Sequence, residues 1–353
     1  MTHSQPLLGV ELSGTGTHPA SWRRADSRAE ELFTAGYWLD AVLAAEAAGV
    51  DLAFLPDSFA PQVQGAVGRL EAVGIAARAA AATHRIGLIP QAPVTHTEPF
   101  HVSKAIASLD FATHGRAGWE VTVSSGQAAL FGRKAEQDPA GLWHEADEAV
   151  EVVARLWDSW EDDAEIRDLT TGRFIDRDKL HYIDFVGENF SVKGPSITPR
   201  PPQGQPPVAV RAEDAHSTRV AVRRADLIRV AAPDLDAAAG IRDELRAAVA
   251  AAGRDPRSVS VLIDLDVHLA ATEEAAAAEF DQLETWTTTP PKALRHIGTP
   301  ATLRALLARI AADGVVLRPL ALPAFLAQLP RLTPTLRDRL GLPHPLNRYA
   351  LTA

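Results

Sequence analysis

Short apolar runs alternate with helical apolar stripes along most of this chain. Residues 86–89 form an apolar run that Pro90 closes, which is typical of a strand buried on both faces. Pro99 can begin a helix whose apolar positions follow helical spacing, and Gly115 ends it. Residues 119–123 form the next apolar run. The pattern therefore predicts a strand–helix–strand unit with parallel strands.

The same alternation continues along the rest of the chain. It predicts eight strands, at residues 7–12, 52–55, 86–89, 119–123, 207–211, 226–231, 259–267 and 314–317. Helical segments separate nearly every pair of these strands. Eight alternating units favour a closed (β/α)8 TIM barrel over an open sheet. Without an internal repeat or a linker, we expect residues 1–353 to form a single domain.

One long stretch interrupts this regular pattern. Between residues 161 and 205 charged residues, glycine and proline dominate, and no helical or strand periodicity persists. Irregular segments of this length in a compact domain are usually functional or packed on the surface. We expect an irregular insertion here, between the fourth helix and the fifth strand.

Composition and charge exclude several classes of function. The chain has 35 Lys and Arg against 45 Asp and Glu, a net charge of −10, and no basic stripe, which argues against nucleic-acid binding. The absence of cysteine excludes disulfides, thiolate catalysis and thiolate metal sites. We see neither a signal peptide nor an apolar run of about 18 residues, and therefore expect a cytoplasmic protein without membrane association.

Small polar residues follow three of the predicted strands. Asp57 and Ser58 follow the second, Thr95 to Thr97 the third, and Ser124 and Ser125 the fourth. Because the carboxyl ends of parallel barrel strands share one rim, we expect these residues to line a ligand site there.

Charged residues also lie inside predicted strands. Strand alternation places Glu120 on the same face as Ser124, towards the barrel interior. A buried carboxylate is costly without a partner, so we predict an ion pair between Glu120 and Arg211 on the next strand. A weaker version of this hypothesis adds Glu11 and Arg229.

A third charged pattern occupies the seventh strand. Asp264, Asp266 and His268 alternate there and invite a metal-site interpretation. No fourth ligand is indicated, so we favour pairing with basic residues of the covering helices and predict no metal.

A family resemblance rests on three stretches, GTGTHPASWR near the start, FLPDS at 54–58 and LDFATHGRAGWEVTVS at 109–124. They resemble the bacterial luciferase-like flavin-dependent monooxygenases. The run 142–202, AALFGR and the tail LRDRLGLPHPLNRYA are similar to the nitrilotriacetate, dibenzothiophene-sulfone and long-chain-alkane monooxygenase branch. This resemblance implies a TIM barrel, usually a homodimer or larger, that binds reduced FMN delivered by a separate flavin reductase. It also implies that a flavin hydroperoxide formed with O2 oxygenates a small organic substrate.

The resemblance assigns roles to individual residues. His18 matches a histidine on the substrate side and is the candidate catalytic acid or base, although it can instead simply pack on Trp22. The implied cofactor-binding residues are Asp57, Ser58, Thr97, Glu120, Ser124, Trp143, Arg211, His216 and Ser217.

Several residues depart from the family pattern. Glu120 stands in place of an amide, and Trp143 replaces a tyrosine whose hydroxyl can reach the phosphate. The phosphate turn, usually Gln-Ala-Gly-x-Ser-x-x-Gly, reads RAEDAHST at 211–218. Glu213 and Asp214 would repel a phosphate, unless they act only as first-turn acids that stabilise the following helix.

A shortened segment adds to these departures, since only residues 285–298 stand where the family often has a longer lid. Two alternatives therefore remain open. One is a luciferase-like oxidoreductase that uses a reduced deazaflavin. The other is a degenerate barrel that has lost flavin affinity and binds a ligand or partner without turnover.

Overall fold

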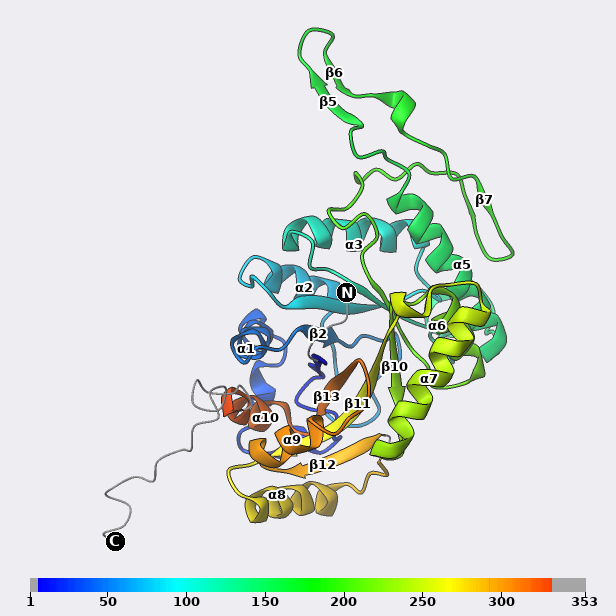
Figure 1. Cartoon of the computed structure of the whole chain (residues 1–353). Helices are drawn as coiled ribbons and strands as arrows, with labels where there is room; N and C mark the ends of the chain where they lie inside the picture. The colour runs from blue at the N-terminus through cyan, green and yellow to red at the C-terminus, as the bar shows by residue number, and fades with distance from the viewer. Residues whose placement is uncertain (1–5, 292, 332–353) are drawn as a thin grey trace.

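The chain folds into a closed parallel barrel surrounded by helices (Figure 1). The computed structural model describes residues 6–291 and 293–331. Adjacent strands pair in parallel around the barrel, and the pairing of β10 with β11 closes it. The barrel strands are β1 (Leu7–Glu11), β2 (Leu52–Leu55), β3 (Gly87–Pro93), β4 (Trp119–Thr122), β9 (Val208–Arg211), β10 (Leu227–Ala231), β11 (Ser260–Leu269) and β13 (Gly314–Pro319). The predicted TIM barrel is confirmed; the C-terminal tail motif at 336–350 lies outside the described residues.

A further strand, β12 (Leu294–Gly298), was not predicted. Its residue Leu294 pairs with Leu265, beyond the point where β10 stops pairing with β11. Because its sequence, LRHIG, is short and half polar, it lacks the apolar run that marks the other strands.

The helices begin and end largely where local signals place them. Asp138 accepts a hydrogen bond from the Gly141 N–H and Pro139 follows it, which together fix the start of α5. Within the described ranges no helix is both long and apolar enough to cross a bilayer. The helices are α1 (Ala35–Ala47), α2 (Ala72–Ala80), α3 (Pro99–Thr113), α4 (Ala128–Phe131), α5 (Pro139–Trp157), α6 (Ala215–Arg224), α7 (Leu235–Ala251), α8 (Glu273–Trp286), α9 (Pro300–Leu307) and α10 (Leu322–Gln328).

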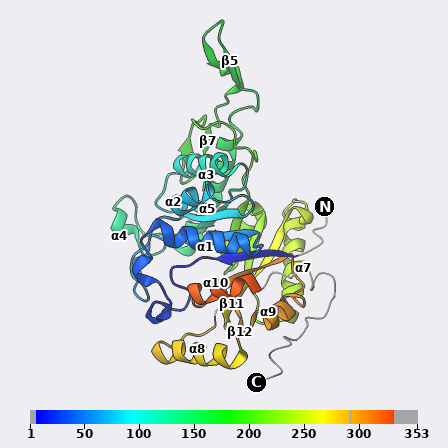
Figure 2. The same ribbon diagram turned by 90° about the vertical axis from the view of Figure 1, so that its left-hand side faces the viewer.

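The predicted insertion forms two small antiparallel hairpins. One joins β5 (Glu165–Asp168) to β6 (Arg173–Ile175), and the other joins β7 (Phe185–Val186) to β8 (Ser191–Val192). Figures 1 and 2 show both standing out from the barrel beyond α3, on the side opposite α8. Glu148 of α5 anchors the second hairpin, because its carboxylate accepts the Glu188 and Asn189 N–H groups.

The level of the barrel interior nearer the amino ends of the strands is apolar. The side chains that fill it are Phe54, Ile89, Ala209, Leu227, Leu262 and Val316. Gly9 belongs to this level, where a Cβ atom would lie only 3.1 Å from the Phe54 ring. Because side chains alternate along a strand, the residues two positions further on point inward at the next level, nearer the carboxyl ends. That level is charged.

Candidate active site

A buried layer of charged and amide side chains crosses the barrel near its carboxyl rim, with Arg229 at its centre. Arg229 is fully buried, and its Nη1 lies 2.9 Å from Glu120 Oε1. Its Nη2 lies 2.6 Å from Glu11 Oε2 and 2.9 Å from Asp264 Oδ1. The guanidinium carbon lies 4.5 Å from the centroid of the Phe54 ring in the apolar layer below. Arg229 therefore joins four strands through one side chain.

The predicted pair between Glu120 and Arg211 is wrong. Glu120 binds Arg229, and Arg211 Nη2 instead lies 2.6 Å from Asp264 Oδ2. The reason is register, because Glu120 is level with Ala209 and Arg211 stands two residues further along its strand. The weaker hypothesis, which paired Glu11 with Arg229, is confirmed.

The layer holds more acids than bases. Burial would raise the pKa of Glu11, but Arg229 and Arg318 hold it at about 2. Burial raises the pKa of Glu120 above its ordinary value despite Arg229, so Glu120 takes up a proton before Glu11 does. The four carboxylates are Glu11, Glu120, Asp264 and Asp266, and the three guanidiniums are Arg211, Arg229 and Arg318.

Gln91, which the sequence analysis missed, connects this layer to the rim. Its Nε2 donates to Glu120 Oε2 at 2.8 Å, and its Oε1 accepts the Asp57 N–H at 2.9 Å. The predicted third strand ended at residue 89, whereas β3 continues to Pro93. Extending the apolar alternation past Pro90 would have placed Gln91 on the inward face.

Asp57 and Ser58 are used in folding the loop that follows β2. The Asp57 carboxylate accepts the Ser58 N–H at 2.7 Å and the Ala72 N–H at 2.9 Å, which ties the loop to the start of α2. Ser58 Oγ accepts the Ala60 N–H at 3.0 Å. Their predicted contact with a flavin ring remains a prediction.

The loops after β3 and β4 carry unsatisfied buried polar atoms. Thr95 Oγ1 accepts the Ser124 N–H at 2.8 Å, but Ser124 Oγ is buried and has no hydrogen-bond partner in the described part of the chain. The His96 ring stacks on Phe131 with centroids 4.3 Å apart, and both its nitrogens likewise lack partners there. Thr97 lines an adjacent hollow of about 190 Å³. Buried polar groups normally have hydrogen-bond partners, so this part of the rim has unpaired polar atoms that a ligand can bond to.

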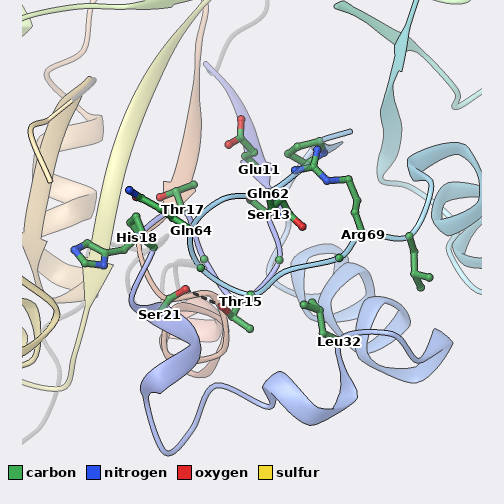
Figure 3. Close-up of a pocket in the computed structure, with 18 of the residues that line it drawn as sticks. Glu11, Ser13, Thr15, Thr17, His18, Ser21, Leu32, Gln62, Gln64 and Arg69 are labelled. Carbon is green, nitrogen blue, oxygen red and sulfur yellow. Dashed lines mark hydrogen bonds between the residues drawn. The ribbon is translucent and has the colours of Figure 1, made fainter. Parts of the chain in front are cut away.

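His18 lines a larger hollow of about 260 Å³ at the ends of β1 and β13 (Figure 3). Its Nδ1 accepts the Ala20 N–H at 3.1 Å, which assigns the ring hydrogen to Nε2. Nε2 lies 3.4 Å from Glu284 Oε1 on α8. Burial lowers the pKa of His18 despite this carboxylate, so the imidazole is neutral at pH 7.

The opposite wall of this hollow comes from the loop between β2 and α2. Gln62 and Arg69 both belong to this loop and line the hollow (Figure 3). Gln62 Oε1 is buried without a hydrogen-bond partner, and Arg69 makes no ion pair within residues 6–291 and 293–331. Neither residue was predicted, because both lie in the irregular loop that precedes α2 at Ala72.

The expected phosphate turn is closed by its own side chains. Asp214 Oδ1 accepts the His216 and Ser217 N–H groups, each at 2.8 Å. Ser217 Oγ accepts the Glu213 N–H at 3.0 Å and the Asp214 N–H at 2.9 Å. Asp214 is therefore the N-cap of α6, which confirms for this residue the interpretation as a helix-stabilising acid. These amides are not open to a phosphate.

Trp143 and His216 lie together beside this turn. With Arg219 and Arg223 they line a hollow of about 60 Å³ between α5 and α6. Arg223 Nη1 lies 3.3 Å from Asp147 Oδ2, so part of its charge is already balanced.

The metal interpretation of the seventh strand finds no support in the described ranges, where no group of three suitable ligands occurs. The expected partners on covering helices are also wrong for both aspartates, which pair with arginines of neighbouring strands. Asp266 Oδ1 lies 2.9 Å from Arg318 Nη1. His268 Nε2 does face a helix, 2.9 Å from Glu279 of α8.

The chain is similar to known oxygenases over most of its length. It is 36% identical over 288 residues to N-acetyl-S-(2-succino)cysteine monooxygenase of Bacillus subtilis (strain 168), covering 79% of this chain and 65% of that protein. It is 33% identical over 297 residues to nitrilotriacetate monooxygenase component A of Aminobacter aminovorans, again covering 79% and 65%. The chain thus spans slightly less than two thirds of the length of these relatives.

A solved structure and a family model agree with these relatives. The crystal structure of long-chain alkane monooxygenase superposes with a TM-score of 0.83 at 19% identity, covering 98% of this chain and 94% of that one, which shows the shared fold. The family model described as luciferase-like monooxygenase matches residues 15–317. The resemblance found in the sequence is confirmed, and the chain belongs to the luciferase-like monooxygenase family.

Proposed function

We propose that this chain is the oxygenase component of a two-component monooxygenase that uses a reduced flavin and O2. The observation that carries the proposal is the buried, unpartnered Ser124 Oγ at the barrel rim, in a chain of this family. Buried hydroxyls are normally hydrogen-bonded, so this atom is able to bond to a ligand at the rim. The names of the curated relatives, which are monooxygenases, support the same reaction class.

The rim fits the two ends of FMN differently. Ser124 and His96 offer unpartnered polar atoms, His96 is stacked on Phe131, and His96 and Thr97 line the same hollow, so we assign the isoalloxazine ring to this part of the rim. The turn at α6 does not fit the phosphate, since Asp214 and Ser217 occupy its amides. When bound, the reduced flavin supplies the two electrons that let one atom of O2 enter the substrate and the other leave as water.

The protein's own contribution is positioning and a polar environment. Arg229 holds the acids below the rim in place. Gln91 bonds both to Glu120 of this layer and to the Asp57 N–H, and so links the layer to the loop after β2. Such a preorganised layer needs no rearrangement during turnover. His18, neutral and with its hydrogen on Nε2, is a candidate donor to the reacting oxygen or the substrate.

We place the organic substrate in the hollow between His18 and Arg69. The Arg69 guanidinium, which makes no ion pair within the described residues, favours a small organic acid. Nitrilotriacetate and N-acetyl-S-(2-succino)cysteine, for which the two relatives are named, carry carboxylates and support this class. A separate flavin reductase, a cytoplasmic location and a homodimer belong to the same proposal.

An anaerobic titration with chemically reduced flavins tests this function. Reduced FMN and reduced riboflavin are each added to the purified full chain, and binding is followed by flavin absorbance and protein fluorescence. Micromolar binding of either flavin, followed by oxygenation of an added organic acid on mixing with O2, supports the proposal. Binding only of a reduced deazaflavin indicates the alternative oxidoreductase, and binding of none of the three indicates a barrel without flavin chemistry.

A further inference from the structure

The first turn of α6 presents acceptors to the rim where a phosphate requires donors. Four backbone N–H groups, those of residues 213, 214, 216 and 217, donate to Asp214 Oδ1 or Ser217 Oγ. A phosphate monoester has only acceptor oxygens in its dianionic form, and it binds helix N-termini through such amides. Here the amides are already bonded to a carboxylate and a hydroxyl of the chain itself.

Charge opposes a phosphate at the same place. Asp214 carries a full negative charge at the cap, and its bonds to the amides lower its pKa, although burial alone would raise it. Glu213, whose side chain is 67% exposed, adds a second carboxylate to the turn. A dianion would therefore meet two like charges at the point where the helix dipole would otherwise attract it.

The nearest cation does not reverse this balance. Arg211 Nη2 lies 2.6 Å from Asp264, and its Nε lies 3.4 Å from Glu213. Its charge is thus shared between two carboxylates, one of them fully buried. On this side of α6 the guanidinium is held towards the barrel interior.

Hydroxyl groups suit this turn better than a phosphate does. A hydroxyl donates a hydrogen bond to a carboxylate without adding charge, and a polyol chain carries several such donors. Glu213 and Asp214 supply such acceptors at the turn before α6, where the family pattern puts the phosphate end of the flavin side chain.

From these contacts we infer that the chain selects a reduced flavin without a terminal phosphate, of the riboflavin class, whose ribityl hydroxyls bond to Glu213 and Asp214. The inference rests on the proposed flavin-dependent function and names the cofactor class of that site. On this inference, the acidic turn determines which flavin binds, and it is not a phosphate site that has lost its function.

Paired dissociation constants for reduced riboflavin and reduced FMN, measured by anaerobic equilibrium dialysis with the full chain, test this inference. We expect the wild type to bind riboflavin at least about tenfold more tightly than FMN, the effect of roughly one unfavourable charge contact. Asp214→Asn keeps a good N-cap and removes the charge, so α6 stays folded. The double variant Glu213→Gly/Asp214→Asn removes both negative charges while the amides stay capped, so it should reduce the preference by tightening FMN binding.

Two further variants keep the result interpretable. Asp234→Asn alters the corresponding N-cap of α7, which accepts the Ala237 N–H, and should change neither constant. Arg219→Ala tests the basic hollow beside Trp143 as a displaced phosphate site. A wild type that prefers FMN overturns the inference, and if Arg219→Ala removes that preference the phosphate lies in the hollow. Such a result leaves the flavin-dependent function standing, whereas failure of both flavins to bind overturns function and inference together.

Discussion

Arg229 Nη1 lies 2.9 Å from Glu120 Oε1, deep in the barrel and with both side chains almost fully buried. The same guanidinium also binds Glu11 and Asp264. One cation therefore compensates three acids that come from three different strands. A buried charge that loses its partner is strongly destabilising, so the stability of the barrel depends on Arg229.

Replacing this cation tests that dependence. We expect Arg229→Met to lower the free energy of unfolding by about 3–5 kcal/mol, because it leaves buried carboxylates unpaired. Urea unfolding at pH 7 measures the loss. Arg257→Met is the matched control, since Arg257 is 89% exposed and pairs only at the surface with Asp255, and it should cost less than about 0.5 kcal/mol. A similar small loss for both variants would contradict the role given to Arg229.

Removing one acid from the layer should have a much smaller effect. Glu120→Gln leaves three carboxylates facing three guanidiniums and has nearly the same shape. Because burial raises the pKa of Glu120, its ionised form penalises the native state at neutral pH. We expect the variant to unfold within about 1 kcal/mol of the wild type, or at higher urea, at pH 7. A loss above about 3 kcal/mol would show that the ionised form is required.

Glu11 gives the opposite dependence on pH. Its pKa is held at about 2 in the folded chain against 4.5 for the free side chain. A depressed folded pKa stabilises the protein above the unfolded value and loses that contribution as pH falls towards 2. The contribution is about 3 kcal/mol at pH 7, of which about 2 kcal/mol should be lost by pH 3.

Glu11→Gln isolates this titration. Urea unfolding of both proteins from pH 7 to pH 3 should give a shallower decline for the variant, by about 2 kcal/mol. Parallel curves for the two proteins would mean that Glu11 is not held ionised by its arginines.

The sequence predicted the architecture more reliably than the contacts inside it. The eight barrel strands were found because buried strands and amphipathic helices leave distinct periodic patterns. β12 was not predicted, because its sequence, LRHIG, has no apolar run and the strand pairs only with the end of β11. Alternation correctly placed Glu120 inward. The choice between Arg211 and Arg229 depends on barrel stagger, which a single strand does not encode.

For the site residues too, local features of the sequence were predicted better than contacts between distant segments. The acidic character of the turn at α6 was visible, and so was the alternative that Asp214 stabilises the helix, although its place as the N-cap residue was not. The hollow at His18 and Arg69 was not visible, because its second wall is a loop without periodicity that Asp57 folds back onto α2. Loops of this kind are positioned by tertiary contacts, so their cavity-lining residues emerge only from the structure.

Arg69 should recognise the acidic group of the substrate. Isothermal titration with a panel of small organic acids should find ligands whose affinity Arg69→Gln weakens about 10- to 100-fold, as expected for a charge-assisted hydrogen bond. Arg78→Gln, on the exposed face of α2, is the matched control and should leave the affinity unchanged. Equal affinities for the acids and their neutral amides would argue against an anionic substrate.

His18 provides the last test, because its chemistry and its burial predict a particular pH profile. Burial lowers its pKa, so the neutral form with hydrogen on Nε2 predominates at and above pH 7, and protonation requires a lower pH than for an ordinary histidine. If this neutral form is the active one, turnover should be flat from pH 7 to 9 and fall on the acid side. His18→Gln should lower turnover about 100-fold and remove that acid limb, while the dissociation constant for reduced flavin stays unchanged. A variant that keeps the acid limb would assign it to another group, and one that loses flavin binding would give His18 a structural role in the β1 loop.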